Sequence, residues 1–263
     1  MRAIALGLTR ARYETRVYFR QGDTIFFTFL FPVVMLTIFS VAFSASGDFG
    51  GVSAAEYYLP GMIAAGILLS GVQNLAVDIA TERGDGTLKR LGGTPLPVLS
   101  YFFGKIGQVL ATSFLQILVL LAVARVAFDV ELPTEGSKWL TFLWVYLLGI
   151  MTSAVLGIAL SRVPRTGRSA TAVIIPIVLV LQFISGVYLQ FSLLPGWLQN
   201  FASVFPLKWL AQGMRSVFLP DSFKSVEQNE SWDLGTAAIV LVVWLVAGLV
   251  AARFTFRWIR KDS

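Results

Sequence analysis

The chain alternates between long apolar stretches and short polar segments, and this pattern decides its fold class. Six stretches come near or exceed the roughly 20 residues that a helix needs to cross a bilayer: Thr24–Phe43, Tyr57–Ile79, Tyr101–Phe128, Trp139–Leu160, Thr171–Leu189 and Leu234–Phe256. Pro32 and Pro176 fall inside two of them, where membrane helices tolerate proline. We therefore predict an all-α integral membrane protein in which residues 1–263 form one transmembrane domain.

Residues 1–22 carry a different pattern from the spans. Apolar residues such as Ile4 and Leu8 recur at helical spacing on one face, while Arg12, Arg16 and Arg20 recur every four residues on another. This spacing predicts an amphipathic helix that lies along the cytoplasmic membrane surface. A basic anchor that does no more than fix the topology explains the same pattern equally well.

The connection between the second and third spans, residues 80–98, is polar and punctuated by glycine. Its sequence ERGDGTLKRLGGTPL predicts that Gly84 to Gly86 break the second helix. We expect Thr87 to cap a short helix and Thr94 to cap the next one. The short helix can transmit a push from a docked protein, through the charges of Lys89 and Arg90 and the apolar side chains of Leu88 and Leu91. The alternative is an interfacial loop whose leucines dip into lipid.

The connection between the fifth and sixth spans, residues 190–233, is long and apolar in its first half. Pro195, Pro206 and Pro220 divide that half into pieces too short to cross a bilayer. We predict two short re-entrant or interfacial helices, with Trp197, Trp209 and Trp232 at the level of the outer headgroups. An interfacial cap with no part in transport is the alternative.

Charge supports the membrane assignment and orients the chain. Hydrophobic residues make up 56% of the sequence and charged residues 14%, against roughly 25% charged residues in a soluble domain. Sixteen of the 21 lysines and arginines fall on one side: in the N-terminal segment, the second-to-third and fourth-to-fifth connections and the tail, counting Lys105 just inside the third span and Arg253 near the end of the sixth. The positive-inside rule then places both termini in the cytoplasm of a multi-pass protein. Topology accounts for the net charge of +6, so nucleic-acid binding is not expected.

Several chemistries are excluded by the residue types. The sequence has no cysteine and no histidine, which removes thiolate and imidazole catalysis and the usual zinc sites. It contains no GxxxxGK[ST] phosphate loop. No catalytic residue and no metal site are predicted, and no buried ionisable relay is evident in the spans. If the chain moves a solute uphill, we expect a partner to supply the energy.

Polar side chains inside the spans mark candidate positions on a substrate path. Gln73 and Asn74 are adjacent in the second span, and Gln182 follows Pro176 in the fifth. An unpaired amide in lipid costs several kcal/mol, so we expect these groups to face protein or a cavity. Hydrogen bonds that hold helices together, worth roughly 0.6 kcal/mol each, are an equally good explanation.

Two segments resemble a known family. ERGDGTLKRLGGTPL is similar to the ER-x-x-GTL-x-x-L-x-x-TPL segment of type-2 ABC exporter permeases, nearest to daunorubicin-resistance permeases. FPLKWLAQGMRSVFLP, residues 205–220, resembles the segment before the last span in that class. With six spans and an amphipathic N-terminal helix, the resemblance extends over the whole chain.

The resemblance implies the chain's partners and several roles. It implies pairing with a second permease copy or a close paralogue in a bacterial inner membrane, above two copies of a separate ATP-binding subunit that holds ATP and Mg. Carried over, the segment that docks on that subunit consists of Glu82, Arg83, Gly86, Thr87, Leu88, Lys89, Arg90 and Leu91. It also implies that the N-terminal helix lies near the ATP-binding subunit, that Leu193–Leu219 is re-entrant, and that substrate passes near the first, second and fifth spans.

The predicted function is therefore the membrane subunit of an ATP-driven exporter. Mostly apolar spans with scattered amides suit an amphipathic drug, natural product or lipid. A polysaccharide exporter permease, an intramembrane enzyme and a scaffold subunit of another membrane complex are the alternatives.

Overall fold

The computed structural model describes residues 2–44, 51–164 and 166–255. The side chain of Ile4, together with Arg165 and the predicted last span residue Phe256, lies outside what is described. Within these ranges every regular element is helical. The elements are α1 (Arg2–Tyr18), α2 (Gly22–Ser44), α3 (Ala54–Leu68), the π-helix η1 (Leu69–Asn74), α4 (Leu75–Gly84), α5 (Thr87–Gly92), α6 (Val98–Phe128), α7 (Gly136–Leu160), α8 (Gly167–Ile184), the 3₁₀ turn η2 (Phe191–Leu193), α9 (Gly196–Ala202), α10 (Pro206–Phe218), the 3₁₀ turns η3 (Asp221–Val226) and η4 (Gln228–Glu230), and α11 (Leu234–Thr255).

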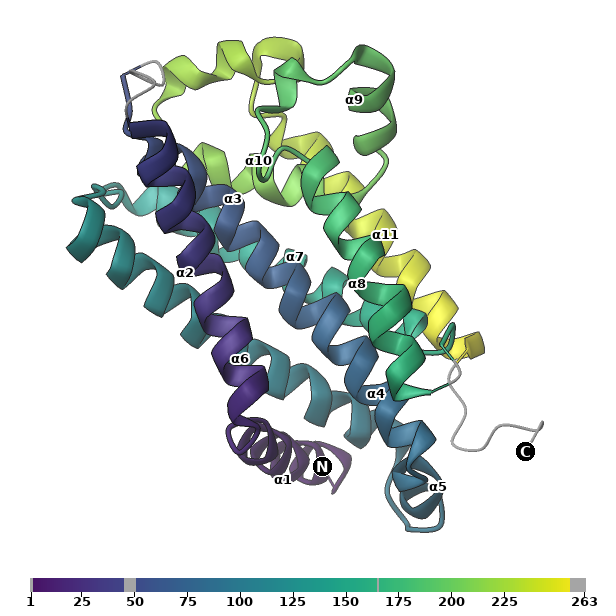
Figure 1. Ribbon diagram of the computed structural model, residues 1–263. Coiled ribbons are helices and arrows are strands. Elements are labelled where there is room, and N and C mark those ends of the chain that lie inside the picture. Colours follow the sequence, from purple (N-terminus) through teal and green to yellow (C-terminus); the bar gives the residue numbers. More distant parts are fainter. Residues whose placement is uncertain (1, 45–50, 165, 256–263) are drawn as a thin grey trace.

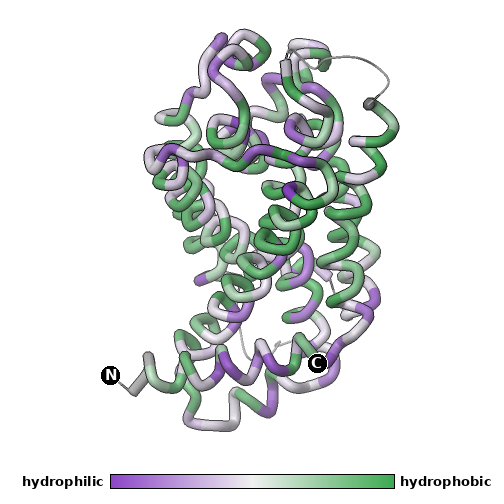
Figure 2. The backbone as a smooth tube through the Cα atoms, turned by 90° about the vertical axis from the view of Figure 1, so that its left-hand side faces the viewer, coloured by the Kyte–Doolittle hydropathy of each residue, from purple (hydrophilic) through white to green (hydrophobic). Residues whose placement is uncertain are grey.

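Six helices are long and apolar enough to cross a membrane, which confirms the predicted number of spans. They cover Gly22–Phe43, Ala54–Gly84, Val98–Phe128, Gly136–Leu160, Gly167–Ile184 and Leu234–Phe254. In Figure 1 they form a bundle, with α1 and α5 at one end and α9 and α10 at the other. Hydrophilic segments gather toward the two ends of the tube in Figure 2. The side of the membrane on which each end lies stays a prediction.

The second span is the centre of the bundle. Helices α3, η1 and α4 follow one another without a break, and 78% of the most apolar window is buried, against 22% in the first span and 17% in the sixth. A capping box starts this helix: the Glu56 N–H donates to Ser53 Oγ, and the Ser53 N–H donates to the Glu56 carboxylate. This helix begins at Ala54, before the predicted Tyr57, and continues past Ile79 to Gly84, where the glycines were predicted to break it.

The fifth span ends earlier than predicted. Helix α8 begins after a Thr166 cap and ends at Ile184, whereas the predicted boundary was Leu189. Gly186 has a φ of 76°, which reverses the chain at a cost that only glycine avoids. The apolar residues 187–189 lie beyond this turn, and their composition made the span look longer than it is.

The caps predicted between the second and third spans are wrong by a few residues. Gly86, with a φ of 79°, is the N-cap of α5, and Thr87 is the first helical residue. The Thr87 N–H donates to Asp85 Oδ1 at 2.9 Å. Thr94 Oγ1 donates to the Leu91 carbonyl and so closes α5 instead of starting the next helix, which begins at Val98.

Candidate functional site

The π-helix η1 places the predicted path residues at the middle of the central span. Gly71 lies against α7 so closely that an added Cβ would be 2.4 Å from Ser153 Cβ. Likewise a Cβ on Gly157 of α7 would be 2.2 Å from the Gly71 carbonyl oxygen. Backbone therefore meets backbone on this side of η1. π-Segments inside α-helices are frequently found at functional sites.

A cavity of about 500 Å³ opens between α2, η1 and α8. All three predicted path residues, Gln73, Asn74 and Gln182, line it. Most of its remaining wall is apolar, from Phe27, Phe31, Leu69, Ile175, Val178 and Leu179, with Asp23 and threonines at 24, 28 and 171. The first, second and fifth spans thus enclose one open site, and these are the spans that the resemblance names.

The amides in this wall also hold helices together. Asn74 Nδ2 donates to Thr28 Oγ1 at 3.1 Å and links the second span to the first. Gln182 is 1% exposed, and its Oε1 accepts from the Tyr188 hydroxyl at 2.5 Å. Burial raises the pKa of Tyr188 to about 12, so the hydroxyl stays protonated and continues to donate. Asn74 and Gln182 therefore both line the cavity and hold helices together. Gln73 is half-buried and lines the cavity, and within the described residues it makes no side-chain hydrogen bond to another helix.

A second cavity of about 250 Å³ adjoins the first toward α1. The two share five lining residues, Thr24, Gln73, Asn74, Thr171 and Ile175. The smaller cavity is more polar, because Glu14 of α1 and Asp78 of α4 line it. We call the two cavities together the groove. It runs from the middle of the bundle to the end that carries α1.

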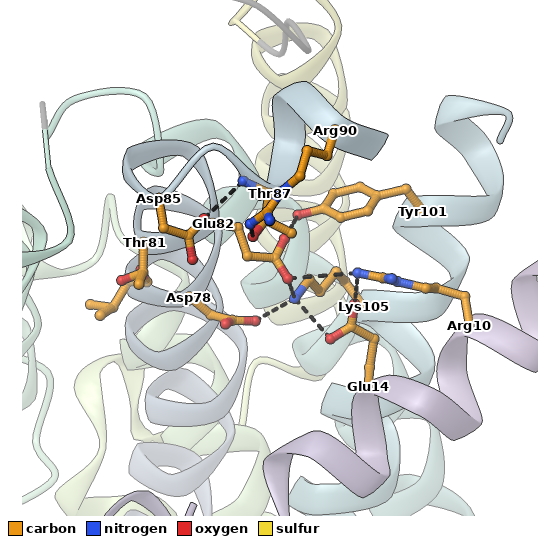
Figure 3. Close-up of polar contacts among 11 residues, drawn as sticks. Arg10, Glu14, Asp78, Thr81, Glu82, Asp85, Thr87, Arg90, Tyr101 and Lys105 are labelled. Atoms are coloured by element: carbon orange, nitrogen blue, oxygen red, sulfur yellow. Dashed lines mark hydrogen bonds and ion pairs between the residues drawn. The ribbon is translucent and has the colours of Figure 1, made fainter. Parts of the chain in front are cut away.

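A buried ion cluster forms the wall of the groove at that end (Figure 3). Lys105 of α6 has a fully buried side chain. Its Nζ donates to Asp78 at 2.5 Å, to Glu82 at 2.7 Å and to Glu14 at 3.0 Å. Arg10 adds an ion pair to Glu14 at 2.5 Å, and Tyr101 donates to the other Glu82 oxygen at 2.7 Å. The cluster ties together α1, α4 and α6.

This cluster corrects the expectation that the spans hold no convergent ionisable groups. Its members come from three distant parts of the sequence, so no local motif announces it. Three signals were nevertheless present: Asp78 and Glu82 stand four residues apart on one helical face, Lys105 falls within a span, and Glu14 is the single acid in the first 22 residues of the sequence. The carboxylates of Glu14, Asp78 and Glu82 lie within 4.8 Å of one another, in the arrangement of a metal site. The ammonium group of Lys105 already occupies their centre.

The predicted docking segment divides into an inward and an outward part. Glu82 belongs to the ion cluster, and Arg83 donates to the Ser161 carbonyl at 2.7 Å and to Ser161 Oγ at 3.3 Å. Leu88 is 1% exposed and packs in the chain's own core, which corrects the expectation that its side chain is free to enter a partner's groove. Leu91 is half-buried against the same core.

The outward part of the docking segment is polar. Lys89 and Arg90 on α5 are exposed, and Gly86 and Thr87 are half-buried beside them. Helix α1, at the same end of the bundle, exposes Arg12 and Arg16, and Arg20 is exposed in the turn that follows it. This end therefore presents a basic surface made by two short elements, and the position of α1 along a membrane stays a prediction.

At the opposite end, α10 is packed inside the protein. Trp209 and Trp232 are 5% and 7% exposed, so only Trp197, at 71%, stands free as predicted for a residue at the headgroups. Arg215 forms an ion pair with Glu227, and Gln212 donates to the Ser231 and Trp232 carbonyls. These contacts give Arg215 a structural role that the sequence did not reveal.

Lys208 on α10 is the contrasting case. Its side chain is fully buried, and within the described residues its Nζ has no hydrogen-bond partner. The ammonium group lies 3.5 Å from the centre of the Trp209 ring. Burial lowers the pKa of Lys208 to about 8, an effect that Glu227 opposes.

The chain is similar to known transporter proteins. Residues 46–254 match the family model described as "ABC-2 family transporter protein". The chain is 27% identical over 191 residues to ABC transporter G family member 20 of Dictyostelium discoideum, covering 73% of the chain and 25% of that protein. It is 24% identical over 178 residues to the probable multidrug ABC transporter permease YbhR of Escherichia coli K12, covering 68% and 48%. A third relative is the inner membrane transport permease YadH of the same strain, 21% identical over 193 residues and 72% and 74% covered. The chain thus spans about a quarter and about half of the length of the first two relatives.

Proposed function

The chain belongs to the ABC-2 family of transporter proteins, and from that premise we propose that it is the transmembrane subunit of an ATP-driven exporter. It moves an amphipathic or hydrophobic molecule, such as a drug, a natural product or a lipid, out of the cytoplasm or the inner leaflet. A separate ATP-binding subunit, present in two copies, holds ATP and Mg and supplies the energy. Two permease copies, or this chain and a close paralogue, form the membrane part in a bacterial inner membrane, with the termini in the cytoplasm. The names of the relatives support this assignment, since one is called a probable multidrug ABC transporter permease and another an inner membrane transport permease.

The observation that carries the proposal is the groove. Three amides predicted from the sequence line one cavity of about 500 Å³ between the first, second and fifth spans. Ligand sites are mostly apolar concavities with a few polar groups, and volumes of about 300–1,000 Å³ are typical. An apolar molecule with one polar group fits this wall, whereas a highly charged solute would lose its hydration there without compensation.

The energy enters at the basic end of the bundle. Lys89 and Arg90 are exposed on α5. The buried side chain of Leu88 holds α5 in place, and the ion pair of Glu82 with Lys105 holds the end of α4 that precedes it. Leu88 therefore shapes the docking surface from behind, and the charges make the contact. A rigid support is what a docking helix needs if a push is to reach the spans.

The test of docking is co-purification and coupling with the ATP-binding subunit. We expect Lys89→Glu with Arg90→Glu to abolish substrate-stimulated ATP hydrolysis in reconstituted membranes, while the variant still inserts and keeps its thermal stability. Lys224→Glu is the matched control and should leave stimulation unchanged, because Lys224 lies on η3, in the segment at the opposite end of the bundle (Figure 1). Full stimulation in the double variant would rule out α5 as the docking element.

The test of the groove separates lining from packing. Gln73→Leu should change selectivity among substrates and leave assembly and basal ATP hydrolysis near normal. Gln182→Leu removes the acceptor of the buried Tyr188 hydroxyl, so it should lower thermal stability and affect all substrates alike. Equal loss of every substrate in Gln73→Leu, without a change in selectivity, would remove Gln73 from the path.

A further inference from the structure

The charges in the groove have one sign. The side chains that line the two cavities include three carboxylates, Glu14, Asp23 and Asp78. Among the described residues, no lysine or arginine lines either cavity. Arg20, only three residues before Asp23, is exposed and is not part of the lining. This contrasts with the chain as a whole, whose net charge is +6.

Two of these carboxylates already have partners. Glu14 and Asp78 belong to the ion cluster, in which three carboxylates face the two cations Lys105 and Arg10. The cluster therefore retains one net negative charge when its members are ionised. The Asp78 side chain is 40% exposed and carries this charge to the surface of the smaller cavity.

Asp23 is the carboxylate available to a ligand. It is exposed, it lines the larger cavity, and within the described part of the chain no ion pair includes it. Phe27 and Phe31 follow it on the same helix at spacings of four residues, so one stripe of α2 offers a carboxylate and then two aromatic rings to the cavity. The opposite wall is aliphatic, from Val178 and Leu179 of α8.

We propose that the groove selects amphipathic organic cations, whose positive group pairs with Asp23 and whose apolar body lies against Phe27, Phe31 and the α8 wall. This inference rests on the proposed function, since it names the substrate class of the same groove. Aromatic faces attract cations in addition to burying apolar surface. An anionic amphiphile of the same size meets only like charges among the lining side chains and is rejected.

The experiment is a binding measurement on the whole chain in the uncharged detergent dodecyl maltoside. The probes are three dansylamidopropyl compounds that differ only in the head: trimethylammonium, its neutral isostere tert-butyl, and sulfonate. We expect the cation to bind about five- to tenfold more tightly than the neutral probe, the effect of one partly screened charge pair. The sulfonate should bind more weakly than both.

Two variants of the groove and one control assign the preference. Asp23→Asn should reduce cation binding about five- to tenfold and change neutral binding less than twofold. Thr171→Lys adds a positive charge to the wall shared by both cavities and should reduce the preference for the cation over the sulfonate. Glu131→Gln removes an exposed acid in the connection between α6 and α7 and should change nothing.

The contrary results are distinct from a failure of the exporter proposal. Equal affinity for the cation and its neutral isostere, no binding of any probe, or full cation preference in Asp23→Asn would each overturn the inference. The exporter proposal is tested separately by co-purification of the ATP-binding subunit, which does not depend on Asp23. A chain that assembles with that subunit but lacks cation preference overturns the selectivity alone.

Discussion

Replacing Lys105 by methionine is the most direct perturbation of the ion cluster. Its ammonium group is fully buried and holds three carboxylates at 2.5 to 3.0 Å. Methionine keeps most of the apolar stem and removes the charge, so the change isolates electrostatics from packing. The carboxylates then stand within 4.8 Å of one another, with Arg10 as the remaining cation.

The magnitude follows from burial and distance. Removing one partner of a buried ion pair costs about 3–5 kcal/mol, because the other charge stays buried without compensation. Repulsion between two carboxylates at that separation adds about 3 kcal/mol at an effective dielectric constant of about 20. Rotation of Asp78, which is 40% exposed, toward the groove relieves part of this. We expect a net loss of about 3–5 kcal/mol and a fall in the midpoint of thermal unfolding of about 10 °C.

The assay is thermal unfolding in detergent, followed by tryptophan fluorescence and by the monodisperse peak on size exclusion. Lys105→Met combined with Glu82→Gln should recover part of the loss, since the second change removes one of the repelling charges. Lys224→Met, which breaks an exposed pair with Asp221, should shift the midpoint by about 2 °C or less. A Lys105→Met midpoint as close to the native one as that of the control would refute the role assigned to the cluster.

Three further predictions test other parts of the structure. A cysteine at Trp197, which is 71% exposed, should react with an impermeant thiol reagent added from outside, whereas one at the fully buried Gln212 should not. Labelling of Trp197→Cys from the cytoplasmic side alone would show that the predicted orientation in the membrane is wrong. Gly157→Ala should lower the unfolding midpoint by several degrees, because its Cβ would meet the Gly71 carbonyl oxygen at 2.2 Å, and an unchanged midpoint would disprove the close contact. Burial lowers the pKa of Lys208 from 10.5 to about 8, so the cost of its charge is fully present below pH 8 and is lost as the pH rises toward 10.5. Lys208→Met should therefore be more stable than the native chain at pH 7, with a free energy of unfolding about 1–2 kcal/mol higher after the Trp209 contact is discounted, and should unfold at a higher temperature. This difference in stability should disappear by pH 10.

The sequence predicted the elements that depend on composition over many residues. Six spans follow from apolar length, because no other structure satisfies twenty backbone amides in lipid. Gln73, Asn74 and Gln182 were found as candidates for the same reason: an amide among apolar residues must face protein or a cavity, and all three line one cavity. The free-energy cost of burying an unpaired polar group is so large that the surroundings of such a residue can be predicted from the sequence alone.

What the sequence did not predict depends on contacts between distant residues. Leu88 looked available in a short amphipathic helix, but the fold turns it into the core. The π-helix at Leu69–Asn74 leaves no mark in composition, and in the structure it coincides with the close approach of Gly157 to Gly71. Lys105 was counted with the basic residues that set topology, although its partners Glu14 and Asp78 lie 91 and 27 residues away.

The ion cluster and the groove are parts of one arrangement. Glu82 stands two residues before the end of α4, directly ahead of the turn into α5, and it binds Lys105. Lys105 in turn holds Glu14 and Asp78, and these two side chains form the wall of the smaller cavity. If a subunit docks on α5 as proposed, we expect its displacement of α5 to act on Glu82 and the wall of the smaller cavity to move with it, because the ion pairs are short and Lys105 is fully buried. Contact alone does not establish coupling, which requires that both sites bias the same change. Glu82→Gln provides the measurement: it keeps the hydrogen-bond acceptor for Tyr101 but weakens the link to Lys105, so it should lower ATP hydrolysis stimulated by substrate more than basal hydrolysis.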